Sequence, residues 1–306
     1  MTDKILCIYH GNCQDGFGAA WAVRHALGAD RVEFHAGIYQ DPPPDVAGRH
    51  VLIVDFSYKR PMLQGMATAA NSITVLDQHK SAMEDLAGFR EPASAAQFRA
   101  QAIPGYQPYH AIRALFDMNR SGAGIAWDFF HPNQKRPRLI DYIEDRDLWR
   151  FALPGTREIA AALFSYPYDL GTWDELMTGD HTRRLREEGV AIERKHHKDI
   201  AELVDALWRK MVIGGHVVPV ANLPYTLASD AGTWMCRGLD EGLAGSWIPP
   251  FVACYWDTRE GRVFSLRSLY GGSDVSEIAK LYGGGGHRNA AGFRVPFADL
   301  ERLGLA

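Results

Sequence analysis

The sequence predicts an α/β protein with two domains: a first domain built on a parallel sheet flanked by helices, and a smaller second α/β domain. Its 306 residues leave room for two domains. Apolar runs alternate with helical patterns over residues 1–80, which is typical of a parallel sheet with helices on both faces. From about residue 211 the pattern changes to closely spaced strand candidates with two helix candidates among them. This change indicates a second folding unit.

Four apolar runs supply the strands expected in the first domain. They are KILCIYH (4–10), VEFHAGIY (32–39), HVLIVDF (50–56) and SITVLD (72–77). Between the first two runs, Phe17, Ala20, Trp21 and Leu27 recur at the spacing of one helical face. Pro61 opens a second helix candidate, RPMLQGMATAA, between the third and fourth runs.

Three further helices are expected in the middle of the chain. SGAGIAWDFFHP has a cap at Ser121 and a stop at Pro132, and RLIDYIEDRDLW is apolar at helical spacing. Residues 181–210 lack proline and carry dense charge, so we expect a long, largely solvated helix there. The predicted domains are therefore residues 1–180 and 211–306, with this helix as the linker between them.

The second domain is predicted from five shorter segments. Its strand candidates are VIGGHVVPVANL (212–223), FVACYWD (251–257) and RVFSLRS (262–268), and its helix candidates are GTWMCRGLDEGL (232–243) and SDVSEIAKLYG (273–283). The last helix candidate runs straight into GGGGHRNAAGF.

Composition and charge exclude several classes of protein. The chain is 46% hydrophobic and 23% charged, and its net charge of −4 argues against a protein that coats long nucleic acid by neutralising phosphates. No apolar stretch approaches the roughly 20 residues that span a bilayer, and MTDKILCIYHG lacks a signal-peptide pattern. The four cysteines form no CxxC pair. We therefore expect reduced thiols in a cytoplasmic protein.

Polar residues follow several of the predicted strands at the point where each strand ends. A lone polar residue after a strand is usually a turn or cap residue. The carboxyl ends of parallel strands, however, meet at one edge of the sheet, where ligands bind. Imidazole, carboxylate and thiolate are metal ligands, and oxygen-rich clusters suit Mn²⁺ or Mg²⁺. The residues expected at this edge are His10, Cys13, Asp15, Asp55, Asp77 and His79.

Five motifs carry a resemblance to a known family. HGNCQDGFGAAWA, VDFS, VLDQHK, EDRDLW and GGGGHRNAAGF resemble the motifs of the DHH phosphoesterase superfamily with a DHHA1 domain. That superfamily includes RecJ-like exonucleases, nanoRNA and cyclic-dinucleotide phosphodiesterases, exopolyphosphatases and family II pyrophosphatases. The resemblance covers both ends of the chain and much of its middle.

The resemblance implies a centre with two Mn²⁺ ions, with Mg²⁺ or another divalent cation as the alternative. Asp55 would bridge the ions, and Asp77 and His79 would be catalytic, with His79 near the scissile phosphate. The other implied metal ligands are His10 and Cys13 for the first ion, and Asp15, Gln78 and Asp147, with Asp145 as a rival of Asp147, for the second.

Two residues depart from the family pattern. Cys13 stands where the first motif usually offers an Asp, and Gln78 stands where the family has the middle His of its Asp-His-His triplet. An amide oxygen ligates Mn²⁺ more weakly than an imidazole does. The sequence leaves open whether the second ion is labile, bound mainly with substrate, or absent.

A glycine-rich segment in the second domain predicts an anion site. Successive glycines let backbone N–H groups point into one concavity. The resemblance makes this segment the substrate-holding loop and adds an arginine of the FSLRS segment. The implied substrate-binding residues are Arg267, Gly284, Gly285, Gly286, His287, Arg288 and Asn289.

The function implied is metal-assisted hydrolysis of phosphodiester or phosphomonoester bonds in short nucleotides. The candidate substrates are nanoRNA, linear or cyclic dinucleotides, and 3′-phosphoadenosine 5′-phosphate. The alternatives are a polyphosphate or pyrophosphate hydrolase, and a nucleotide-binding protein with lost or weakened hydrolysis. We expect neither long duplex nucleic acid nor a membrane as a partner, and the sequence leaves the oligomeric state open.

Overall fold

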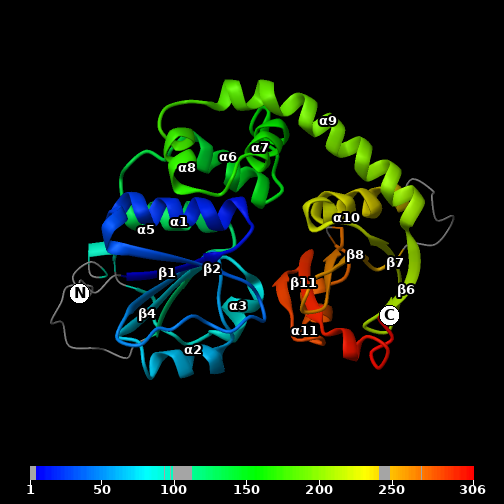
Figure 1. The fold of residues 1–306 in the computed structure, drawn as a ribbon, viewed down its shortest axis with the longest axis horizontal. Coiled ribbons are helices and arrows are strands. Elements are labelled where there is room, and N and C mark those ends of the chain that lie inside the picture. Colours follow the sequence, from blue (N-terminus) through cyan, green and yellow to red (C-terminus); the bar gives the residue numbers. More distant parts are fainter. Residues whose placement is uncertain (1–4, 93, 97, 99–111, 241–248, 270) are drawn as a thin grey trace. The chain divides into compact units, whose positions relative to one another are not determined.

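The computed structural model describes residues 5–92, 94–96, 98, 112–240, 249–269 and 271–306. The chain forms two compact units, Met1–Glu193 and Arg194–Ala306. The division falls inside one long helix, α9 (Thr182–Leu207), which was expected as the linker (Figure 1). Each unit is an α/β structure, as predicted.

The first unit is built on a parallel sheet of five strands in the order β2-β1-β3-β4-β5. The strands are β1 (Ile5–His10), β2 (Val32–Gly37), β3 (His50–Val54), β4 (Ser72–Asp77) and β5 (Ile112–Phe116). Four of them confirm the predicted runs. The sequence analysis did not predict β5, a short strand at the edge of the sheet.

Helices cover both faces of this sheet (Figure 1). Alternate residues of β1 enter two cores: Cys7 packs with α1 and α5, whereas Ile8 packs with Leu63 of α2. The hydroxyl of Ser121 accepts a hydrogen bond from the backbone N–H of Gly124 and caps α5, as predicted. The helices of this unit are α1 (Gln14–Leu27), α2 (Arg60–Ala67), α3 (Lys80–Asp85), α5 (Gly122–Phe130), α6 (Arg138–Asp147), α7 (Thr156–Ser165) and α8 (Leu170–Met177).

The second unit has a six-stranded sheet in the order β10-β11-β9-β8-β7-β6. Only β7 and β8 pair in parallel; the other pairs are antiparallel. The strands are β6 (Arg209–Ile213), β7 (His216–Asn222), β8 (Val252–Asp257), β9 (Arg262–Arg267), β10 (Gly285–His287) and β11 (Ala290–Val295), and the helices are α10 (Tyr225–Asp240) and α11 (Val275–Lys280).

Two expectations for the second half of the chain need correction. The segment 212–223 is not one strand, because Gly214 and Gly215 have φ of 58° and 80° and turn the chain between β6 and β7. GGGGHRNAAGF is not an open loop, because β10 and β11 pair within it as a hairpin. Helix α9 is largely exposed, as expected, although Ile200 and Val204 near its end are buried in a core with α10. The end of the helix candidate 232–243 lies outside the described residues.

Among the described helices, none combines the length and the apolar character that crossing a membrane requires.

Candidate metal centre

The centre lies at the carboxyl edge of the first sheet, where β1, β3 and β4 are neighbours. His10 is the last residue of β1, Asp55 follows β3, and Gln78 and His79 follow β4. Asp55 thus lies on the middle of the three strands, as the topology predicted. Asp55, Gln78 and His79 are buried, which is unusual for such polar groups unless they have partners.

Three side chains offer a set of metal ligands. One ligand atom from each of His10, Asp55 and His79 lies within 4.8 Å of the others. Oδ2 of Asp55 is 3.5 Å from Nδ1 of His10 and, in the described part of the chain, has no hydrogen-bond partner although it is buried. Two imidazoles and an unsatisfied carboxylate oxygen are donors that suit a divalent transition metal. A divalent ion therefore fits here, with a ligand set that lacks the predicted Cys13.

Asp55 owes its position to an unusual backbone conformation. Its φ is 55°, in the left-handed region that non-glycine residues rarely adopt. A Cβ on Gly122, the first residue of α5, would lie only 2.4 Å from Cβ of Asp55. The absence of a side chain at Gly122 therefore allows α5 to begin directly against the carboxylate.

Asp77 positions His79. Oδ1 of Asp77 is 2.7 Å from Nδ1 of His79 and also accepts a hydrogen bond from the backbone N–H of Gln78 at 2.8 Å. Burial alone would lower the pKa of His79, but Asp77 outweighs burial and raises it to about 9. A carboxylate at one ring nitrogen is common around metal-binding histidines. His79 thus lies with His10 and Asp55 as one of three possible metal ligands, and its role near the scissile phosphate stays a prediction.

Gln78 joins two carboxylates. Its Nε2 donates to Oδ1 of Asp55 at 2.6 Å and lies 3.2 Å from Oδ2 of Asp15. Asp15 also accepts backbone N–H groups of Gly122, at 2.6 Å, and Ala123, at 2.9 Å. Both oxygens of Asp15 are therefore used within the protein. Burial raises the pKa of Asp15 well above its ordinary value, and the charge of Asp55 acts in the same direction.

The structure separates the two rival aspartates of α6. Asp145 accepts hydrogen bonds from the N–H groups of Ala152 and Leu153 and the hydroxyl of Thr156, so its carboxylate holds the chain after α6. Asp147 has a buried Oδ2 without a hydrogen-bond partner in the described structure. Burial and the charge of Asp55 raise the pKa of Asp147 to about 6.

Two more side chains border the centre. Cys13 lies outside the set of three ligand atoms; burial and the charges of Asp55 and Asp15 raise the pKa of its thiol. Tyr39, which the sequence analysis missed, has its ring 5.3 Å from that of His10 and 5.9 Å from that of His79. Tyr39 follows the end of β2. Its position after a strand at the same sheet edge could have identified it as a residue near the centre.

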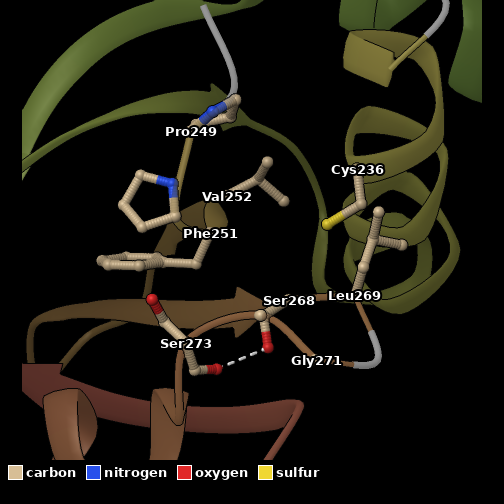
Figure 2. Close-up of a pocket in the computed structure, with 10 residues that line it drawn as sticks. Cys236, Pro249, Phe251, Val252, Ser268, Leu269, Gly271 and Ser273 are labelled. Atoms are coloured by element: carbon tan, nitrogen blue, oxygen red, sulfur yellow. Dashed lines mark hydrogen bonds between the residues drawn. The ribbon is translucent and has the colours of Figure 1, made fainter.

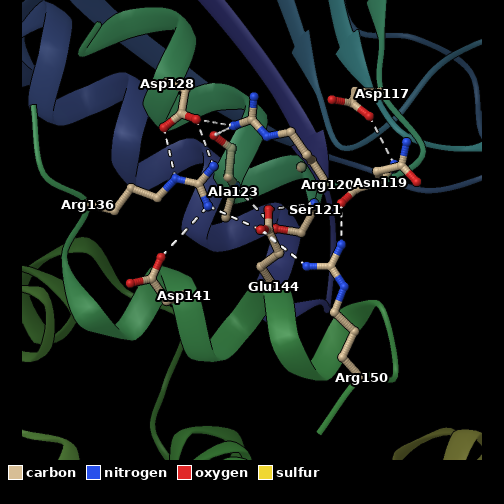
Figure 3. A network of polar contacts seen from close by, with 12 residues as sticks. Asp117, Asn119, Arg120, Ser121, Ala123, Asp128, Arg136, Asp141, Glu144 and Arg150 are labelled. Atoms are coloured by element: carbon tan, nitrogen blue, oxygen red, sulfur yellow. Dashed lines mark hydrogen bonds and ion pairs between the residues drawn. The ribbon is translucent and has the colours of Figure 1, made fainter. Parts of the chain in front are cut away.

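A network of charges supports the start of α5 (Figure 3). Glu144 accepts the backbone N–H of Ser121 at 3.0 Å and pairs with Arg136 at 3.2 Å. Arg136 and Arg120 both bind Asp128. The network therefore fixes the helix terminus whose N–H groups bind Asp15.

The predicted substrate residues of the second unit surround one hairpin. His287 ends β10, and the side chains of the turn are tied to the loop after β9: Asn289 donates to the hydroxyl of Ser268 at 2.8 Å, and Arg288 lies 3.4 Å from Asp274. The guanidinium of Arg267 donates to the hydroxyl of Ser229 and to a backbone carbonyl of β9. Gly284 and Gly286 meet the backbone of β11 too closely for a Cβ.

A cavity of about 540 Å³ lies beside this loop (Figure 2). Ser268, which binds Asn289, also donates to the carbonyl of Ser273 on its wall. The apolar lining of the cavity includes Phe251 and Leu269. The cavity offers an apolar surface next to the hydrogen-bonding groups of the hairpin.

Comparisons with known proteins give remote likenesses. No protein-family model matches the chain. Uncharacterized protein R106 of Acanthamoeba polyphaga mimivirus is 27% identical over 332 aligned positions, which cover 98% of this chain and 71% of the relative.

Three solved structures illustrate the likeness of fold. RecJ with Mn²⁺ from Thermus thermophilus is 15% identical, with a TM-score of 0.47, over 98% of this chain and 51% of RecJ. The pGpG-specific phosphodiesterase PggH from Vibrio cholerae is 11% identical, with a TM-score of 0.39, over 98% and 96% of the two chains. A putative family II inorganic pyrophosphatase from Methanococcus jannaschii is 12% identical, with a TM-score of 0.29, over 99% and 100%.

In its motifs, in their order along the chain and in its two α/β units, the chain resembles the DHH phosphoesterase superfamily.

Proposed function

We propose that the chain is a divalent-metal-dependent phosphoesterase, with Mn²⁺ as the metal, that hydrolyses phosphodiester or phosphomonoester bonds of short nucleotides. The observation that carries the proposal is the ligand set of His10, Asp55 and His79 with the unsatisfied oxygen of Asp55 at a sheet edge. Divalent cations in such sites lower the pKa of water and offset the charge of phosphoryl oxygens. The resemblance of the motifs favours phosphate esters as the substrate class.

The residues have distinct roles in this proposal. Asp55, His10 and His79 hold the cation, and Asp77 orients the His79 ring through its contact with Nδ1. His287 and Arg288, on the hairpin of the second unit, bind the phosphate groups of the substrate by charge and hydrogen bonding.

The cavity of the second unit favours nucleotides over inorganic polyphosphate. A nucleobase has an apolar face that gains from contact with an apolar side chain such as Leu269, which is exposed on the cavity lining. Polyphosphate has no such face and needs only cationic or N–H groups. The cavity lining therefore supports a substrate with a base.

A hydrolysis screen with Mn²⁺ tests the proposal. The substrates are short RNA, linear and cyclic dinucleotides, 3′-phosphoadenosine 5′-phosphate, polyphosphate and pyrophosphate. Asp55→Asn should lower the rate about 100-fold or more, because it removes a ligand charge. Asp30→Asn, an exposed site in the same unit, is the matched control. A wild-type chain inactive on all substrates, or an active Asp55→Asn variant, overturns the proposal.

A further inference from the structure

The Gln78 amide lies where the resemblance would place a second cation, between the carboxylates of Asp15 and Asp55. We infer that the amide NH₂ of Gln78 replaces that cation, so the centre holds one divalent ion, bound by His10, Asp55 and His79. This inference rests on the proposed metal centre and deepens it. It makes Asp15 a structural residue and the NH₂ of Gln78 a bridge between the two carboxylates.

The first step is the orientation of the Gln78 amide. Nε2 is 2.6 Å from one oxygen of Asp55 and 3.2 Å from one oxygen of Asp15. If the amide were reversed, its oxygen would face both carboxylates and all contacts would be between acceptors. The NH₂ group is a double donor, so it satisfies one oxygen of each carboxylate.

The second step is the use of Asp15 by the protein itself. The N–H of Gly122 and that of Ala123 donate to its two different oxygens. A carboxylate at the N-terminus of a helix is stabilised there without a metal. Asp15 therefore anchors α5 to the turn after β1, and a second ion would have to displace the Gln78 amide to reach it.

The third step is the contrast with the proposed ion site. Oδ2 of Asp55, the oxygen turned toward His10, has no hydrogen-bond partner among the described residues, whereas Oδ1 receives the Gln78 amide. The two oxygens of one carboxylate thus serve two tasks. One oxygen is left for an ion, and the other is held by the amide.

The test is the Mn²⁺ stoichiometry of the full chain, measured by calorimetric titration, with electron paramagnetic resonance to detect a coupled ion pair. The wild-type chain should bind one ion and show no coupled signal. Two bound ions with a coupled signal, or no bound ion, overturn the inference. Because this measurement needs no variant, it does not depend on the folding of one.

Gln78→Glu sharpens the test, because it replaces the NH₂ by an oxygen of the same size. Three carboxylates would then meet, so the variant should unfold at lower temperature than the wild type in EDTA. Added Mn²⁺ should restore its melting temperature and raise the stoichiometry from one to two. A Gln78→Glu variant whose stability is independent of Mn²⁺ contradicts the bridging role.

The matched control is Gln14→Glu. Gln14 is also buried, but its amide donates to the carbonyl of Ala160 at 2.8 Å. This variant should also lose stability, yet Mn²⁺ should raise its melting temperature no more than it raises that of the wild type. The stoichiometry and the hydrolysis screen separate the two proposals. One bound ion without hydrolysis defeats only the proposed function, and two bound ions with hydrolysis defeat only this inference.

Discussion

Oδ1 of Asp77 lies 2.7 Å from Nδ1 of His79, so a buried carboxylate holds one ring nitrogen of the histidine. Only one residue separates the two along the chain. The pairing orients the ring of His79, so we expect Asp77 to act as a positioning residue.

Asp77→Asn should weaken Mn²⁺ binding by about 10- to 100-fold, because the neutral amide holds the imidazole less firmly and makes it a poorer donor. The measurement is the Mn²⁺ affinity by titration, with circular dichroism to check the fold. Asp117→Asn, just after β5 on the same sheet edge, is the control, since Asp117 hydrogen-bonds the N–H of Asn119 instead. Equal affinity in the wild type and Asp77→Asn would refute the positioning role.

Gly122→Ala should destabilise the first unit by about 1–3 kcal/mol and weaken Mn²⁺ binding, because its Cβ would lie 2.4 Å from Cβ of Asp55. Urea unfolding and Mn²⁺ titration measure the two effects. Gly65→Ala is the matched control: Gly65 is also helical, and a Cβ there meets nothing within 4 Å. It should be neutral or stabilise by up to about 1 kcal/mol. Similar losses in both variants would show that close contact at Asp55 is not the cause.

His287→Ala should weaken the binding of phosphorylated nucleotides by about 10- to 100-fold, since a hydrogen bond to a charged group contributes about 1.5–3 kcal/mol. Mn²⁺ binding by the first unit should not change, because the residue belongs to the other unit. His216→Ala, at an exposed position of the same sheet, is the control. Unchanged nucleotide affinity in His287→Ala would make the hairpin purely structural.

Asp128→Asn should change the acid stability of the chain. Burial raises the pKa of Asp128, but the hydrogen bonds of Arg136 and the charge of Arg120 outweigh burial and lower it. A carboxyl with a lowered pKa stabilises the fold above its unfolded pKa, about 3.9, and this contribution is lost as the pH falls through the lower folded value. The stability difference between wild type and Asp128→Asn should therefore be largest near pH 5 and shrink toward pH 2. Melting temperatures across this range measure it, and a constant difference would contradict the assignment.

The strands and the sheet edge could be predicted from the sequence, because buried parallel strands are continuous apolar runs and their carboxyl ends must meet. This rule predicts from the sequence that His10, Asp55 and His79 lie at the same edge of the sheet. It could not predict β5, a short segment beyond the fourth run. Nor could it predict the hairpin in GGGGHRNAAGF, since a run of glycines is equally compatible with a loop.

The finer features of the centre depend on side-chain partners that are distant in the sequence. Asp145 and Asp147 lie on the same helix. They are distinguished by their partners, because the N–H of Ala152 and the hydroxyl of Thr156 donate hydrogen bonds to the carboxylate of Asp145. The sequence places Gln78 directly after β4, next to His79. It could not show that the amide would present its nitrogen rather than its oxygen, because that choice depends on Asp15.

The hydrogen bond from Gly122 to Asp15 joins residues 107 positions apart in the chain. Contacts of such sequence separation form slowly, because a long loop must close before they contribute any stability. On a growing polypeptide, β1, β3 and β4 emerge from the ribosome before α5 does. In the nascent chain, Asp15 and Asp55 are therefore made before the N-terminus of α5 that later packs against them. During refolding, the rate of Mn²⁺ binding should follow the rate at which α5 docks on the sheet.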